Sequence, residues 1–163
     1  RDARIAPIYE GTNGIQALDL VGRKMGAHGG RYLRSFFHPV LAFIEAAGED
    51  PDMEEFILPL SKAFGRLQQV TAELARKGLG DAFEAGAGAT EYLRLFGLTA
   101  LGYAWARMAQ IALQHPEDET GFYRAKLATA RFYMQRVLPE TSSLAAKVLA
   151  GGETLKAFED ALF

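Results

Sequence analysis

The sequence of 163 residues contains no cysteine, and this absence removes several kinds of chemistry. Disulfide bonds, thiolate metal sites and catalysis by a thiol are all excluded. An excess of charge of one sign is also lacking, because 18 Lys and Arg residues are balanced by 20 Asp and Glu residues, for a net charge of −2. A nucleic-acid-binding surface needs a clear basic patch, so this balance argues against one.

Long hydrophobic runs are missing as well. The longest, residues 95–106, is interrupted by Thr99 and is too short to cross a bilayer. No stretch has the pattern of a signal peptide, and we expect a cytoplasmic protein. However, the sequence begins at Arg1 and not at Met, inside a motif described below. We therefore expect it to be the C-terminal piece of a longer polypeptide, whose N-terminal targeting segment, if any, lies outside this chain.

Residues suited to metal binding are few. None of His28, His38 and His115 has an acidic residue three positions earlier, as the Glu-x-x-His motif of di-iron bundles requires. The acidic clusters at 49–52 and 117–119 lack the ligand spacing and central glycine of a calcium loop. We expect no metal site, and we interpret these clusters as solvated turns.

What the sequence does contain is apolar residues at helical spacing. Hydrophobic residues make up 49% of the chain, which is ample for a core. The region from Pro51 to about Lys77 carries a run whose spacing alternates between four and three residues, typical of the seam of an antiparallel helical bundle. Its members are Phe56, Leu60, Ala63, Leu67, Val70 and Leu74. No convincing strand pattern competes with it, so we predict an all-α fold.

Glycine, proline and capping residues predict where the helices end. We expect a first bundle helix over 31–47, kinked or split at Pro39, and a second that begins at Asp50-Pro51 and is kinked at Pro59. Asp81 should cap a third, extending as far as Gln114. Later helices are expected over 122–138, 140–150 and 155–162.

The small residues at 85–89 could suggest a phosphate-binding loop, but the surrounding sequence excludes it. The stretch Ala85-Gly86-Ala87-Gly88-Ala89 has no preceding strand and no Lys-Ser or Lys-Thr pair. We interpret these residues as allowing two helices to approach closely.

The segment most suggestive of chemistry is a turn at Glu10. Gly11 allows a tight turn, and Thr12 and Asn13 are both favourable N-cap residues. A helix should follow, with Ile15, Leu18, Val21 and Met25 on one apolar stripe, and residues 26–30 should end it. A carboxylate on such a turn could point into a cleft and act as a base, although most carboxylates before a helix are solvated or capping residues.

This segment resembles the last catalytic segment of the acyl-CoA dehydrogenases. The likeness rests on Arg1-Asp2-Ala3-Arg4-Ile5, Tyr9-Glu10-Gly11-Thr12-Asn13, Ile15-Gln16 and Arg23. It implies that Glu10 is the base that removes the α-proton of an acyl-CoA, that Gly11 lies beside the substrate, and that Thr12, Asn13 and Gly14 lie along FAD. Gly14 and Ala17 replace the larger polar residues usual in the family, so side-chain contacts to FAD differ at these positions.

The rest of the chain resembles the extra C-terminal helical domain of a longer subgroup of that family, which includes the 3-methylmercaptopropionyl-CoA dehydrogenases. The likeness is carried by the stretches 92–97 and 130–133. It implies two parts, with residues 1–29 ending the catalytic fold and residues 30–163 forming an appended helical bundle.

The resemblance also implies an acyl-CoA substrate, an electron-transfer flavoprotein or similar electron acceptor, and a homo-oligomer. FAD is expected in the full-length parent, whereas the chain alone is expected to hold no FAD and to be inactive. Three alternatives stay open. They are an acyl-CoA oxidase, a non-catalytic helical oligomerisation or interaction module, and a flavoprotein of the DNA-alkylation response, against which the net charge of −2 argues.

Overall fold

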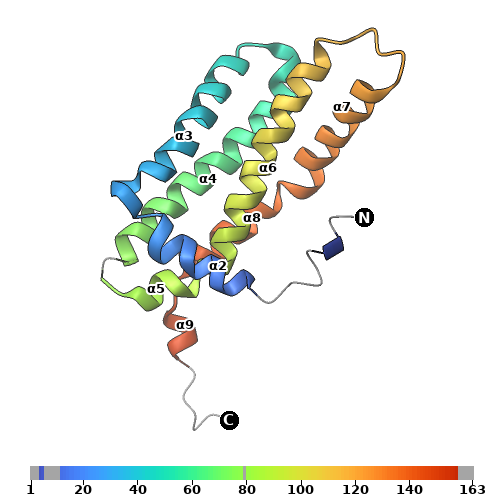
Figure 1. The fold of residues 1–163 in the computed structure, drawn as a ribbon. Helices are drawn as coiled ribbons and strands as arrows, with labels where there is room; N and C mark the ends of the chain where they lie inside the picture. The colour runs from blue at the N-terminus through green and yellow to red at the C-terminus, as the bar shows by residue number, and fades with distance from the viewer. Residues whose placement is uncertain (1–3, 6–11, 79, 158–163) are drawn as a thin grey trace.

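A computed structural model describes residues 4–5, 12–78 and 80–157. Every regular element within these residues is helical, and the elements pack into an antiparallel bundle (Figure 1). The prediction of an all-α bundle is therefore confirmed. No helix within these ranges is long and apolar enough to span a membrane.

The long helices of the bundle are α3, α4, α6 and the nearly continuous pair α7 and α8, and shorter elements lie at its ends and turns. Two of these, η2 and η4, are π-helical turns, and η3 is a 3₁₀ turn. The bounds are α2 Asn13–Asp19, η2 Leu20–Lys24, α3 Ala27–Ala47, η3 Pro51–Met53, α4 Glu54–Gly78, α5 Ala82–Ala87, α6 Ala89–Leu113, α7 Phe122–Phe132, η4 Tyr133–Val137, α8 Glu140–Ala150 and α9 Glu153–Lys156.

The core of the bundle follows the seam of α4. All six residues of the predicted seam, from Phe56 to Leu74, are buried. They face α6, α7 and α8, and aromatic rings of α3 fill the space toward α6, where Phe36 and Phe96 lie 4.8 Å apart. One buried polar pair crosses this core: the hydroxyls of Thr71 and Tyr92 are 2.7 Å apart, and burial raises the pKa of Tyr92 to about 12.

Two of the predicted helix starts are confirmed by capping hydrogen bonds. The Asp50 carboxylate accepts from the Asp52 amide at 3.0 Å, and the Asp81 carboxylate accepts from the Phe83 amide at 2.8 Å. Each satisfies an amide that has no partner within its own helix.

Proline interrupts the helices less than expected. Pro39 lies inside α3, which continues through it, so of the two predicted outcomes, a kink or a split, the split does not occur. Neighbouring Val40 is fully buried, and this packing outweighs the single hydrogen bond that a proline removes. The predicted interruption at Pro139 takes the form of the π-turn η4, in which the Leu138 amide donates to the Tyr133 carbonyl at 2.9 Å.

The single helix expected from Asp81 to Gln114 is also wrong, because Gly88 divides it into α5 and α6. A Cβ at Gly88 would lie 2.9 Å from Cγ1 and 3.2 Å from Cα of Val148 on α8. The close helix approach predicted from the small residues is therefore confirmed, and it occurs where the chain changes direction.

Candidate functional site

The residues of the predicted site lie at the start of α2. Glu10 and Gly11, the predicted base and substrate neighbour, lie outside the described residues, so their roles stay predictions. Thr12, Asn13 and Gly14 are described, and all three are exposed. The described residues therefore include the three that the family resemblance assigns to contact with the cofactor.

The polar groups at the start of α2 are exposed to solvent. Thr12 occupies the N-cap position, and its carbonyl accepts from the Gln16 amide at 2.8 Å. Its hydroxyl makes no capping hydrogen bond to the helix, contrary to the simplest expectation for an N-cap threonine. Nothing lies within 4 Å of the position that a Cβ on Gly14 would occupy. Thr12, Asn13 and Gly14 are thus exposed at the start of α2, and their contact with FAD stays a prediction.

The apolar stripe predicted for α2 is only partly buried. Met25 is buried and Val21 half-buried, as expected, whereas Ile15 and Leu18 are 65% and 56% exposed. Ala17 is the one fully buried residue of α2, where the helix packs against α6 and a small side chain allows close approach (Figure 1). Leu18 nevertheless faces α5 on the same side as Val21 and Met25, so only Ile15 departs from the expected stripe.

Charges near the end of the π-turn η2 stabilise this segment. The Asp19 carboxylate accepts from Arg23 Nη2 at 2.8 Å and lies 3.1 Å from Lys24 Nζ. The hydrogen bonds from Arg23 and then from Lys24 lower the pKa of Asp19 to about 2. Because both cations stand in the last turn, they also oppose the negative end of the helix dipole.

The helix break predicted over residues 26–30 is confirmed. His28, Gly29 and Gly30 have φ values of 51°, 62° and 77°, so three consecutive residues adopt left-handed backbone conformations. Glycine adopts this conformation readily, whereas His28 does so at some cost. The division into parts 1–29 and 30–163 stays a prediction, but the change of direction on which it was based is real.

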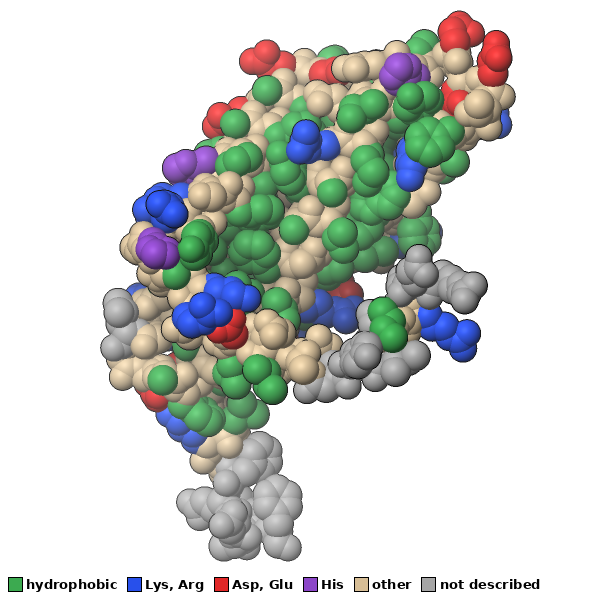
Figure 2. Space-filling view, in the orientation of Figure 1, with side chains coloured by type: hydrophobic (Ala, Val, Ile, Leu, Met, Phe, Trp, Pro, Cys, Tyr) green, Lys and Arg blue, Asp and Glu red, His purple; other side chains and the backbone are tan. Residues whose placement is uncertain are grey.

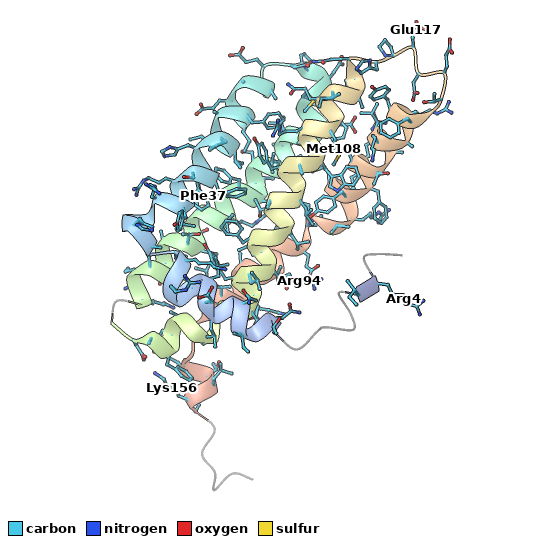
Figure 3. The ribbon with its side chains drawn as sticks, in the orientation of Figure 1. Arg4, Phe37, Arg94, Met108, Glu117 and Lys156 are labelled. Carbon is cyan, nitrogen blue, oxygen red and sulfur yellow. The ribbon has the colours of Figure 1, made fainter. Side chains whose placement is uncertain are left out.

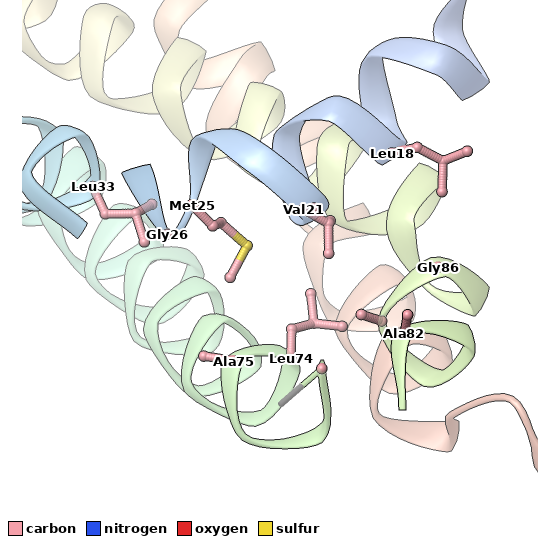
Figure 4. A pocket seen from close by; sticks show the side chains of 12 residues that line it. Leu18, Val21, Met25, Gly26, Leu33, Leu74, Ala75, Ala82 and Gly86 are labelled. Atoms are coloured by element: carbon pink, nitrogen blue, oxygen red, sulfur yellow. The ribbon is translucent and has the colours of Figure 1, made fainter. Parts of the chain in front are cut away.

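An apolar cavity of about 520 Å³, which the sequence did not predict, lies beside this break (Figure 4). One wall is formed by Leu18, Val21 and Met25, and the other by Leu74, Ala82 and neighbouring residues of α4 and α5. Its lining contains no acid, base or nucleophile, so it suits an apolar side chain or ligand and not catalysis. The signal that could have revealed it is glycine on both walls, at 22, 26, 78 and 86.

Within the described ranges, no cluster of three or more His, Asp or Glu side chains could hold a metal ion. Side chains suited to catalysis do not converge there either. The fold and the candidate site thus define a helical-bundle domain preceded by a short helix whose polar start is exposed.

The chain belongs to the acetyl-CoA dehydrogenase C-terminal-like family, whose model matches residues 36–159. It is 35% identical to the 3-methylmercaptopropionyl-CoA dehydrogenase of Ruegeria pomeroyi, over 95% of the chain and 27% of that protein. It is 28% identical to a broad-specificity linear acyl-CoA dehydrogenase of Mycobacterium tuberculosis, over 88% of the chain and 25% of that protein. A butyryl-CoA dehydrogenase of Syntrophomonas wolfei is 26% identical, over 85% of the chain and 24% of its own length.

These similarities confirm the resemblance to the C-terminal region of acyl-CoA dehydrogenases, including the subgroup named from the sequence. The chain spans about a quarter of the length of the curated relatives that it matches.

Proposed function

We propose that this chain is the C-terminal part of an FAD-dependent acyl-CoA dehydrogenase, in which Glu10 is the catalytic base. The observation that carries the proposal is the order of residues at the start of the chain. Glu10 and Gly11 directly precede Thr12, Asn13 and Gly14, which are exposed at the start of α2, where a cofactor held by another part of the enzyme could reach them.

The reaction divides between Glu10 and the cofactor. The Glu10 carboxylate takes the α-proton of the acyl-CoA thioester, and a double bond forms between the α- and β-carbons. FAD, bound in the full-length protein, supplies the acceptor for the hydride that leaves the β-carbon. The Glu10 backbone N–H donates to the thioester carbonyl oxygen and stabilises the negative charge that develops there. Thr12, Asn13 and Gly14 would help hold the cofactor, and an electron-transfer flavoprotein or similar protein would be the electron acceptor.

The test is Glu10→Gln in the full-length protein. The amide keeps the size of the side chain but cannot accept the proton, so acyl-CoA should still bind while reduction of the flavin slows. General-base catalysis alone accounts for roughly 10²- to 10⁴-fold in rate, and we expect at least that loss. The measurement is anaerobic bleaching of the flavin by a panel of acyl-CoA substrates in a stopped-flow instrument. A near-normal rate of bleaching in the variant would show that Glu10 is not the base.

The 163-residue chain by itself should not bind FAD. Thr12, Asn13 and Gly14 offer only a few hydrogen bonds, each worth about 1 kcal/mol net. That is too little to offset the entropy lost when a large cofactor is immobilised. Titration of FAD with the purified chain, followed by flavin fluorescence, should give no saturable quenching. Saturable binding in the micromolar range would mean that the chain contains a complete cofactor site.

A further inference from the structure

Helix α2 directly follows the turn that carries the proposed base, yet it contacts the bundle at few places. Ala17 is its only buried residue, and the remaining residues of α2 are exposed or half-buried. Asp19, Arg23 and Lys24 pair with one another at the surface, and Figure 2 shows acidic and basic side chains together over this part of the chain. The position of α2 on the bundle therefore depends on a small number of contacts.

The first of these contacts is Ala17 against α6. The distance between two packed helices depends on the side chains at their contact. Ala17 is fully buried where α2 packs against α6, so its methyl group sets how closely the two helices approach. A larger side chain at this position would push α2 away from the bundle.

The second contact is Leu18 against α5. A Cβ on Gly86 would lie 3.6 Å from Leu18 Cδ2, which is van der Waals distance, and Figure 4 shows the two residues facing each other. Successive residues of an α-helix project about 100° apart around its axis. The contacts at Ala17 and Leu18 therefore hold α2 from two directions, one from α6 and one from α5.

Helix α5 is itself held by the turn between α8 and α9. Its six residues are fewer than the roughly 12–15 that an isolated helix needs, so it depends on its neighbours. The Gly152 amide donates to Glu84 Oε2 at 3.0 Å. Lys156 Nζ donates to Asp81 Oδ2 at 2.7 Å and lies 4.6 Å from the centre of the Phe83 ring. Figure 3 shows Lys156 on α9 beside α5.

Two glycines allow this turn to approach α5 closely. A Cβ on Gly151 would lie 2.7 Å from Glu84 Oε2, and a Cβ on Gly152 would lie 2.7 Å from Phe83 Cε1. Both distances are well below the contact distance of non-bonded atoms. Gly151 also has a φ of 74°, which favours glycine. The chain thus has glycine at the two consecutive positions where a side chain would separate the turn from α5.

We propose that the bundle positions Glu10 through α2, with Ala17 fixing α2 on α6 and with α5, held by the α8–α9 turn, supporting it from the side. Glu10 lies three residues before Asn13, the first residue of α2, so the two Cα atoms are within about 11 Å of each other. A shift of α2 moves the base relative to a substrate held by another part of the enzyme, and a misplacement of about 1 Å can cost about a hundredfold in rate. Ala17 and Glu84 are thus positioning residues, and the inference rests on the proposed function of Glu10.

The first test enlarges Ala17 in the full-length protein. Ala17→Leu should slow anaerobic reduction of the flavin about 10- to 100-fold, measured per bound flavin with a saturating concentration of the fastest acyl-CoA of the panel. Because removal of the α-proton becomes harder, the kinetic isotope effect with the α-deuterated substrate should increase. Ala17→Ser keeps the side chain small and should retain most of the rate. Leu60→Ala is the control for general destabilisation, because Leu60 belongs to the other core cluster of the bundle, and it should change neither quantity.

Comparison with Glu10→Gln separates failure of this inference from failure of the proposed function. Rapid bleaching in Glu10→Gln means that Glu10 is not the base, and it overturns both. Slow bleaching in Glu10→Gln, together with a normal rate and isotope effect in Ala17→Leu, leaves the base in place and overturns the positioning role of α2. Equal slowing in Leu60→Ala also overturns it, because the loss then follows the stability of the bundle.

The second test depends neither on activity nor on Ala17. Glu84→Ala removes the acceptor of the Gly152 amide, and amide hydrogen exchange of the full-length protein should become about two to ten times faster over residues 82–87, the effect of losing one hydrogen bond. If α5 supports α2, exchange should also become faster over residues 16–24. Glu55→Ala is the matched control, since it removes a carboxylate paired with α7 near the opposite end of α4. Faster exchange over 82–87 alone, no change in either segment, or an equal effect of Glu55→Ala on residues 16–24 contradicts the proposal.

Discussion

Helix α4 and the segment formed by α2 and η2 use their apolar residues differently. Of the 25 residues of α4, nine are buried, and together they form the centre of the bundle. In α2 only Ala17 is buried and in η2 no residue is, whereas Ile15 and Leu18 are more than half exposed, although Leu18 lines the apolar cavity beside α5. The bundle supplies its own core, but the segment that begins with the predicted site leaves most of its side chains available for contacts beyond the bundle.

The stabilising core and the proposed site therefore lie in different parts of the chain. The six seam residues of α4 are determined by packing, since each must fit between neighbouring helices. The start of α2 is free of that constraint, so the polar groups of Thr12 and Asn13 need not be paired within the bundle. This is the arrangement that a site completed by another part of an enzyme requires.

The largest expected difference between α4 and α2 appears when a leucine side chain is removed from each of them. Leu60 is fully buried, so Leu60→Ala should lower the free energy of unfolding by about 2–5 kcal/mol. Leu18→Ala removes the same atoms from a side chain that is 56% exposed, and the change should stay within about 0.5 kcal/mol. Urea unfolding followed by circular dichroism measures both. Similar losses for the two variants would show that α2 belongs to the same cooperative core as α4.

Substitutions at Gly88 and Gly65 compare a closely packed position of the bundle with an open one. Gly88→Ala places a Cβ 2.9 Å from Val148 Cγ1 and 3.2 Å from its Cα, and overpacking of this kind costs about 1–3 kcal/mol. Gly65→Ala in α4 meets nothing within 4 Å and removes a flexible residue from a helix interior. It should stabilise the chain by about 0.5–1 kcal/mol.

Thermal unfolding, monitored for both proteins in one buffer, should therefore shift in opposite directions. Destabilisation by both substitutions would mean that the environment of Gly65 is tighter in solution than the structure indicates, and stabilisation by both would mean that α8 is not held against Gly88.

Acid should loosen α2 and η2 before the bundle. The pKa of Asp19 falls from 3.8 to about 2 on folding, because the folded state gives its carboxylate Arg23 and Lys24 as partners. A lowered pKa means that the stabilisation is fully present above pH 3.8 and is lost as the pH falls toward 2. The effect should be small, since the pair is exposed to water.

Amide hydrogen exchange at residues 16–24, compared between mildly acidic and more acidic solution, measures this effect. The variant Asp19→Asn is the control, and its exchange in this segment should depend less on pH over the same window. An equal pH dependence in the two proteins would show that another group causes the loosening.

Much of the bundle could be predicted because its signals are local. The alternating spacing of Phe56 to Leu74 is itself the packed face, and the capping carboxylates of Asp50 and Asp81 act on amides only two residues away. The helix break after Gly26 followed from the same kind of local rule. Tertiary packing was less predictable: α3 is not split at Pro39, and α5 ends at Gly88, where Val148 of α8 lies close to the backbone.

The candidate site depended on a different kind of information. A carboxylate on a turn before a helix is a weak signal by itself, and only its resemblance to a known motif singled out Glu10. The exposed polar start of α2 is consistent with that assignment, but the apolar cavity beside η2 was not foreseen, because its two walls come from residues about fifty positions apart.

The sequence alone determined the all-helical class and the core-forming face of α4, and it contains the motif at Glu10 on which the proposed function rests. These depend on spacing, on local hydrogen bonds and on residue identity, which a linear sequence records directly. Only the tertiary structure decided that α2 packs through Ala17, that Ile15 and Leu18 are exposed, and that one side of α6 stays uncovered. A helix that is apolar on every side carries no periodic signal to say which side faces the core, so its exposed side is set by which neighbours reach it.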